Sequence, residues 1–246
     1  MMEKDAIFRY LEQAKELGVK EIYYTGGEPF IHPDMLEILR LTLRDFPTSV
    51  LTNGLPLNDQ RATSIKEIAE SSRFSLEIRL SLDDYDEKRN DKIRGKGTFH
   101  QVLNAYKRLY ENGLLPILTV SEIQDYLHPL KSNESAYQKY VNLLKSLGVQ
   151  RPRIKIIPVF EMGMLPIPKD NHLVTNGMLK GFDHSLLQCS SSRIVAADGI
   201  YGCPILVGKK QSKMGSDSLV QACSPCSLYH PACYTCYMTG MTCKNF

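Results

Sequence analysis

Patterns typical of helices and of strands alternate along the first 160 residues, and this alternation limits the fold more than any other feature. The strand patterns are rich in β-branched and aromatic residues, whereas the helical patterns place apolar residues three or four positions apart. The connections suit right-handed crossovers, so the sequence predicts an α/β fold with a parallel sheet. The expected strands are 21–25, 49–52, 74–82, 114–121 and 153–160, and the expected helices are 5–17, 33–43, 58–71, 98–112 and 135–147.

Glycine and polar residues gather directly after three of the expected strands, in the segments 26–28, 53–54 and 81–83. In parallel α/β folds the carboxyl ends of the strands meet at one edge, and ligands bind there. The sequence therefore predicts a ligand site at these three strand ends.

The side chains at these strand ends have chemical uses, and each also has a purely structural interpretation. The glycine pair 26–27 lets backbone approach a ligand closely, and Glu28 adds an acceptor for a cationic group, but a plain turn would have the same residues. Ser81 and Asp83 share one face of a strand and can hold a ribose diol or an amino-acid head group, although a helix cap is an equal alternative. Arg94 is expected in a flexible basic loop near the same edge, with a solvated surface charge as its alternative.

Four segments in order, 25–29, 52–54, 81–83 and 93–99, closely resemble the radical SAM enzyme superfamily, and the resemblance covers residues 1 to about 160. In that family the Gly-Gly-Glu-Pro segment binds the amino group of S-adenosylmethionine. Polar residues after a later strand line its ribose and methionine part, an arginine contacts its carboxylate, and residues of the Thr-Asn-Gly segment line the central pocket. By this resemblance the binding residues are Gly26, Gly27, Glu28, Pro29, Thr52, Asn53, Ser81, Asp83 and Arg94.

All seven cysteines follow residue 188, although the overall composition is ordinary for a globular protein. Two Cys-x2-Cys pairs, in a chain whose N-terminus has no signal-peptide pattern, indicate metal binding more often than disulfides. Spacing alone leaves both zinc and iron–sulfur clusters open and favours zinc slightly. The candidate metal ligands are Cys189, Cys203, Cys223, Cys226, Cys233, Cys236 and Cys243.

The cysteine-rich tail resembles the SPASM extension of radical SAM enzymes, which has seven motif cysteines and carries auxiliary [4Fe-4S] clusters. This resemblance reverses the preference for zinc. The gaps on either side of Cys233 are six and two residues, whereas five and three are usual, so one or two auxiliary clusters remain open. The usual arrangement would assign one cluster to Cys223, Cys226, Cys233 and Cys243, and another to Cys189, Cys203 and Cys236 with a further ligand.

The chain begins with a helical pattern, whereas each crossover unit pairs a helix with a strand before it. The family also needs a Cys-x3-Cys-x2-Cys motif after that first strand, and residues 1–188 contain no cysteine. Both absences predict an N-terminally truncated sequence that is inactive as given, with the motif encoded just upstream. A degenerate, non-catalytic paralogue is the alternative. Strand 21–25 is then expected at an uncovered edge of the sheet.

The implied fold is therefore a partial (β/α)6 TIM-like barrel that lacks its first strand, followed by a small cysteine-rich C-terminal subdomain. We expect the barrel at 1–160, a linker at 161–188 and the cysteine-rich iron–sulfur domain at 189–246. The tyrosines among the cysteines, Tyr229, Tyr234 and Tyr237, are expected to pack this small subdomain.

The resemblance also implies a function. A reduced cluster gives one electron to S-adenosylmethionine, and the resulting 5′-deoxyadenosyl radical abstracts a hydrogen atom from the substrate, here expected to be a peptide or protein. An electron donor such as flavodoxin or ferredoxin is the implied partner. The net charge of +3 and the lack of a long apolar run predict no nucleic-acid or membrane partner, and a cytoplasmic protein. A zinc-ribbon binding module on an α/β scaffold is the alternative from another class.

Overall fold

The computed structural model describes residues 1–121, 135–157, 160, 172–215 and 217–239. The chain divides into two compact units, one of residues 19–157 and the other of residues 1–18 with 158–246. Each unit is described by itself below. Within the described ranges, no helix combines the length and the apolar character that crossing a membrane requires.

The first unit is built on a five-stranded sheet in which every strand pairs in parallel with the next one along the chain. This order confirms the predicted parallel α/β arrangement, and β1 lies at an edge of the sheet, as expected. The strands are β1 Ile22–Tyr24, β2 Thr48–Thr52, β3 Leu76–Leu82, β4 Ile117–Ser121 and β5 Ile154–Ile157.

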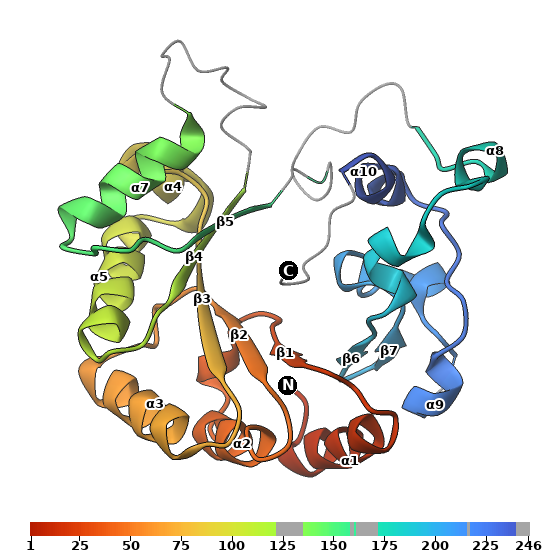
Figure 1. Ribbon diagram of the computed structural model, residues 1–246, viewed down its shortest axis with the longest axis horizontal. Helices are drawn as coiled ribbons and strands as arrows, with labels where there is room; N and C mark the ends of the chain where they lie inside the picture. Colours follow the sequence, from red (N-terminus) through yellow and green to blue (C-terminus); the bar gives the residue numbers. More distant parts are fainter. Residues whose placement is uncertain (122–134, 158–159, 161–171, 216, 240–246) are drawn as a thin grey trace. The chain divides into compact units, whose positions relative to one another are not determined.

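Helices cover one face of this sheet, where they lie side by side along its outer side (Figure 1). The core forms between them and the strands, and Val50, Leu80 and Leu118 are wholly buried there. Because side chains alternate along a strand, the residues between these core positions face the other side of the sheet. The helices are α2 Met35–Thr42, α3 Asp59–Ser71, α4 Glu87–Arg94, α5 Thr98–Glu111 and α7 Ala136–Ser146, with a 3-10 turn, η1 Pro29–Ile31.

The expectation of a flexible basic loop at 92–97 is wrong, because α4 extends to Arg94. The Asp86 carboxylate caps this helix by accepting a hydrogen bond of 3.0 Å from the backbone N–H of Arg89. The helix ends at Gly95, whose φ of +104° suits glycine. Almost all of its residues are polar, so the hydrophobic periodicity that predicts other helices is missing here.

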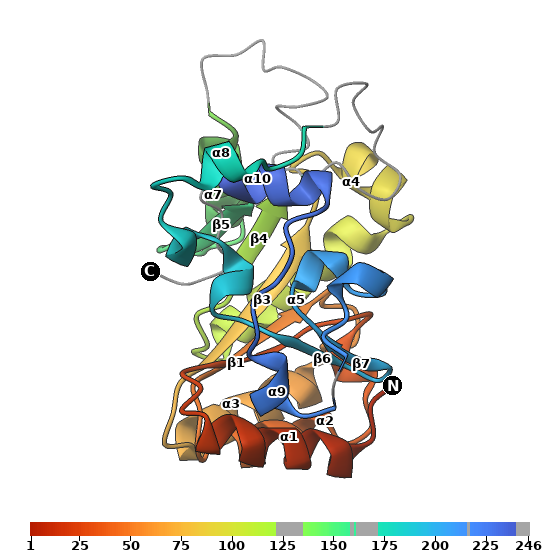
Figure 2. The ribbon, with the colours of Figure 1, turned by 90° about the vertical axis from the view of Figure 1, so that its right-hand side faces the viewer.

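The second unit contains the two ends of the chain, and the predicted linker 161–188 falls partly outside the described residues. Helices α1 Lys4–Glu16 and α9 Leu219–Ala222 lie side by side (Figure 2), and the Leu219 backbone N–H donates a 2.9 Å hydrogen bond to Gln13 Oε1. Strands β6 Ile194–Ala196 and β7 Gly199–Tyr201 form an antiparallel hairpin. The other elements are α8 Asn176–Leu179, η2 His184–Leu186, η3 Gln188–Ser190, η4 Pro204–Leu206, η5 Lys210–Ser212 and α10 Pro231–Thr239.

Candidate functional site

The Glu28 carboxylate ties the carboxyl end of β1 to that of β2. Its Oε1 atom accepts hydrogen bonds from the Phe30 backbone N–H at 3.0 Å and from Thr52 Oγ1 at 2.7 Å. Its Oε2 atom accepts one from the Asn53 backbone N–H at 2.7 Å. Glu28 therefore brings three of the predicted binding residues together, and its side chain shapes the site by holding the two strand ends in place.

Glycines at these two strand ends serve different needs. Gly26 has a φ of +133°, and a side chain at Gly26 or Gly27 would meet no atom within 4 Å. The backbone before Glu28 therefore borders open space that a ligand can occupy. Gly54 has a φ of +77°, and a Cβ atom there would lie 2.7 Å from Leu80 Cδ2, so packing against the core requires glycine.

Asp83 and Arg94, which the sequence predicts as binding residues, form an ion pair. Arg94 Nε lies 2.6 Å from Asp83 Oδ2, and the two side chains are only 25% and 18% exposed. A solvated surface charge is therefore the wrong interpretation of Arg94. The pair places a guanidinium beside the end of β3, where it can bind a carboxylate and where Asp83 fixes its orientation.

Sequence reasoning missed the buried Asp84, which follows Asp83. Its two carboxylate oxygens accept hydrogen bonds from Arg89 Nε at 2.7 Å and from Arg89 Nη2 at 3.1 Å. The side chain of Asp84 is completely buried, so this paired interaction anchors α4 to the end of β3. The available signal was an acidic residue after a strand with an arginine five positions later.

Asn90 and Asp91 fix the turn between α4 and α5, and they too were missed. The fully buried Asn90 accepts a hydrogen bond of 3.1 Å from the Asp83 backbone N–H. Asp91 accepts hydrogen bonds from the Phe99 backbone N–H at 2.9 Å and from Thr98 Oγ1 at 3.2 Å. The bond from Phe99, above all, holds the pKa of Asp91 below its ordinary value. These contacts set the positions of both partners of the Asp83–Arg94 pair.

Hydroxyl groups lie on the face of the sheet that the helices do not cover. Ser81 of β3 is directly opposite Thr119 of β4 in the strand register, and Ser121 follows on the same face. Thr119 is only 8% exposed. The hydroxyl oxygens of Thr119 and Ser121 are buried and have no hydrogen-bond partner among the described residues. Buried hydroxyls are rarely left without a partner, so these two fit a polar ligand at the carboxyl end of the sheet.

Charged side chains near the amino ends of the strands, in contrast, satisfy one another. Glu77 accepts hydrogen bonds from Arg79 Nε at 2.7 Å and from Arg153 Nη2 at 2.8 Å. Burial raises the pKa of Glu77, but these two arginines outweigh it and the net shift is downward. The hydroxyls of Thr119 and Ser121, in contrast, have no such partner among the described residues.

Comparison with known proteins identifies the family. The sequence profile of the Radical SAM superfamily matches residues 1–123, which is half of the chain. The chain belongs to the radical SAM superfamily. Members of this family use S-adenosylmethionine and a [4Fe-4S] cluster, and the open glycines, the Asp83–Arg94 pair and the unpaired hydroxyls fit the first of these. Residues 1–188 contain no cysteine, so they supply no thiolate for a cluster at the same strand ends.

Two curated relatives carry the name of a nucleotide cyclase. A GTP 3',8-cyclase of Clostridium perfringens (strain SM101 / Type A) is 24% identical over 165 residues, which are 65% of this chain and 47% of the relative. A probable GTP 3',8-cyclase of Archaeoglobus fulgidus is 35% identical over 104 residues, which are 42% of this chain and 33% of the relative. The chain therefore spans at most about half the length of these relatives.

Solved structures share the fold. "Native anSMEcpe with bound AdoMet and Kp18Cys peptide" matches with a TM-score of 0.60 and 15% identity, over 90% of this chain and 72% of that one. "Native anSMEcpe with bound AdoMet and Cp18Cys peptide" matches with a TM-score of 0.63 and 14% identity, over 92% of this chain and 73% of that one. Matches of this extent reach beyond the unit that contains the sheet. They confirm the predicted partial barrel followed by a cysteine-rich part.

A second candidate site lies in the C-terminal part of the second unit (the C-terminal unit below), where cysteines surround a cavity of about 250 Å³. All six described cysteines are free, while Cys243 lies outside the described residues. Cys223 is exposed and does not line the cavity. The cysteines that line it are Cys189, Cys203, Cys226, Cys233 and Cys236.

Burial affects three of the thiols that line this cavity, and the backbone of other residues donates hydrogen bonds to two of them. Burial raises the pKa of Cys189 to about 11, and it raises that of Cys203 and of Cys233 as well. The Cys203 sulfur nevertheless accepts hydrogen bonds from the backbone of Ile205 and Leu206. Donors of this kind stabilise a thiolate, so these thiols suit a bound metal that displaces their protons.

The spacing of the thiols distinguishes the two kinds of metal. Among the described residues, no three His, Cys, Asp or Glu side chains converge closely enough to bind a single ion. A structural zinc needs four ligands at about 2.0 to 2.3 Å from one atom. Five thiols spread around one cavity are better suited to a cluster, whose iron atoms each take a separate thiolate. The cavity also joins cysteines of both predicted ligand sets, which favours a single cluster.

Proposed function

We propose that this chain carries the S-adenosylmethionine site and a cluster-binding, SPASM-type extension of a radical SAM enzyme that modifies a peptide or protein. The observation that carries this proposal is that Glu28 joins the carboxyl ends of β1 and β2 beside open glycine backbone, while the Asp83–Arg94 pair lies at the carboxyl end of the next strand, β3. When bound and reduced by one electron, S-adenosylmethionine supplies a carbon radical that can take a hydrogen atom from a substrate.

The residues divide this task among themselves. Arg94 binds the carboxylate of S-adenosylmethionine, and Asp83 keeps the guanidinium in place. The open backbone at Gly26 and Gly27 receives the amino group of S-adenosylmethionine. The hydroxyls of Thr119 and Ser121 form hydrogen bonds with the polar groups of the ligand. An electron donor of the flavodoxin or ferredoxin class supplies the electron. Thiols kept reduced for cluster binding support a cytoplasmic location, which is part of this proposal.

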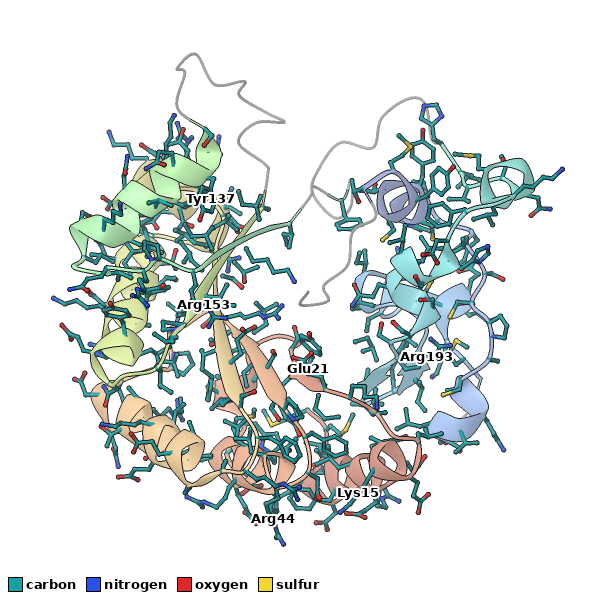
Figure 3. The ribbon with its side chains drawn as sticks, in the orientation of Figure 1. Lys15, Glu21, Arg44, Tyr137, Arg153 and Arg193 are labelled. Atoms are coloured by element: carbon teal, nitrogen blue, oxygen red, sulfur yellow. The ribbon has the colours of Figure 1, made fainter. Side chains whose placement is uncertain are left out.

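The binding role of Arg94 can be tested on the 246-residue chain itself. We expect the chain to bind S-adenosylmethionine in equilibrium dialysis, and Arg94→Gln to weaken this binding at least about tenfold, because a hydrogen bond to a charged group contributes about 1.5–3 kcal/mol. The exposed Arg44 lies in the turn after α2 and points outward (Figure 3). The control variant Arg44→Gln should therefore bind S-adenosylmethionine with unchanged affinity. Equal affinity for all three proteins would contradict the site.

We also expect the chain to leave bound S-adenosylmethionine intact under reducing conditions, because residues 1–188 provide no thiolate near the strand ends. Chromatography of the products measures this, and formation of 5′-deoxyadenosine would contradict it.

The names of the curated relatives favour a second candidate substrate, a guanine nucleotide. If the substrate is a peptide, we expect the chain to show no saturable binding of GTP in equilibrium dialysis when S-adenosylmethionine is present. Saturable GTP binding would replace the peptide with a nucleotide as the substrate class. The peptide is supported by the cysteine-rich unit and by the fold shared with a solved structure that holds a bound Kp18Cys peptide.

A further inference from the structure

Tyr229 has a buried hydroxyl group that no residue in the described part of the chain satisfies. Its ring packs against the small apolar cluster that contains Leu206, Ala232 and Cys233. A buried hydroxyl without a partner costs free energy, and such a group commonly marks a ligand or a redox role. The hydroxyl of Tyr229 therefore needs a partner that the protein atoms alone do not provide.

Two of the cysteines that line the cavity, Cys203 and Cys233, belong to the same packed group as Tyr229. Cys203 and Tyr229 both pack against the apolar cluster that contains Cys233. Burial raises the pKa of Tyr229, and the charges of Cys233 and Cys203 raise it further. The backbone of Tyr229, together with that of His230, also gives hydrogen bonds to the Cys233 sulfur. One residue thus offers a backbone donor to this sulfur and a side-chain donor nearby.

A neutral thiol is a weak acceptor, but a metal-bound thiolate carries negative charge and accepts hydrogen bonds well. Hydrogen bonds to the sulfurs of an iron–sulfur cluster help to set its reduction potential. Such hydrogen bonds favour the reduced state of the cluster, because that state carries one more negative charge. A donor at this position would therefore raise the potential.

We propose that the Tyr229 hydroxyl donates a hydrogen bond to the Cys203–Cys233 sulfur pair when the cavity holds its cluster, and that it raises the reduction potential of that cluster. This inference rests on the proposed cluster in the C-terminal unit. Tyr229 acts as a tuning residue through the sulfur atoms and takes no part in ligating iron.

The test compares Tyr229→Phe with the unchanged chain, both purified without oxygen. We expect equal iron and acid-labile sulfide, and a reduced-to-oxidised ratio at fixed potential that falls about tenfold, equivalent to 59 mV for a one-electron couple. Tyr237→Phe is the matched control, because the Tyr237 hydroxyl already donates to the Met178 carbonyl oxygen at 3.2 Å, and it should leave the potential unchanged.

The outcomes separate the two proposals. An unchanged chain without iron and sulfide would contradict the proposed cluster itself. A normal cluster with the same potential in Tyr229→Phe would contradict only the role of Tyr229. Should Tyr229→Phe lose its cluster, incorporation of 3-fluorotyrosine at position 229 keeps the shape and makes the hydroxyl a stronger donor. We then expect a higher potential, and no shift would overturn the inference.

Discussion

The Cys233→Ser variant, purified without oxygen, is expected to lose most of the iron and acid-labile sulfide that the unchanged chain binds. Cys233 is buried, lines the cavity with four other cysteines and receives backbone hydrogen bonds at its sulfur. Serine is a poor ligand for iron in such a cluster, which takes thiolates. Metal and sulfide analysis with the visible absorption spectrum measures the loss.

The matched control is Cys223→Ser, because Cys223 is exposed and lies off the cavity. We expect this variant to keep its iron, sulfide and brown colour. An equal loss in both variants would contradict a single cluster in this cavity and support the two-set assignment in which Cys223 is a ligand. Colourless protein with stoichiometric zinc would overturn the cluster altogether.

Cluster loss should also destabilise the C-terminal unit. This unit has only short strands and mostly short helices, so little apolar surface is buried by regular packing. In small metal-binding domains, much of the folding free energy comes from the metal. We therefore expect Cys233→Ser to expose this part of the chain to proteolysis first, while the sheet of the first unit resists.

The second large effect is expected from Glu28→Ala. This change removes the acceptor of three hydrogen bonds. One of the donors is the hydroxyl of Thr52, a residue that is only 2% exposed. Leaving buried donors unsatisfied costs about 1–3 kcal/mol each, so we expect the free energy of unfolding to fall by about 3 kcal/mol in urea. The affinity for S-adenosylmethionine should fall more than tenfold, because the two strand ends are no longer held together.

Glu67→Ala is the control for this change, since Glu67 is an exposed residue of α3. It should alter neither stability nor affinity by more than the error. Glu28→Gln keeps one acceptor oxygen and should fall between Glu28→Ala and the unchanged chain. Normal stability of Glu28→Ala would show that these hydrogen bonds do not hold the strand ends.

The sheet could be predicted because its strands repeat one simple pattern. Residues such as Val50 and Leu118 are wholly buried, and their strands can be recognised as short β-branched and aromatic runs between helical patterns. Helix α4 could not be predicted in this way, because its stability comes from the Asp86 cap and the Asp84–Arg89 pair. Those are contacts between side chains and leave no hydrophobic period.

The candidate site was predictable in its positions and much less so in its contacts. Family resemblance located Asp83 and Arg94, but their ion pair depends on the fold of α4. Family resemblance likewise divided the cysteines into two sets. Helix α10 instead presents Cys233 and Cys236 three residues apart, on one face, to the cavity that Cys189 also lines.

The order of the strands in the sheet has a consequence for how the first unit folds. Each strand pairs with the strand that follows it in sequence, so no pairing has to wait for a distant part of the chain. The loops closed at each step stay short, and the entropy lost in closing them stays small. A sheet of this kind can grow one βα unit at a time, because each new pairing closes only the loop of a single crossover unit.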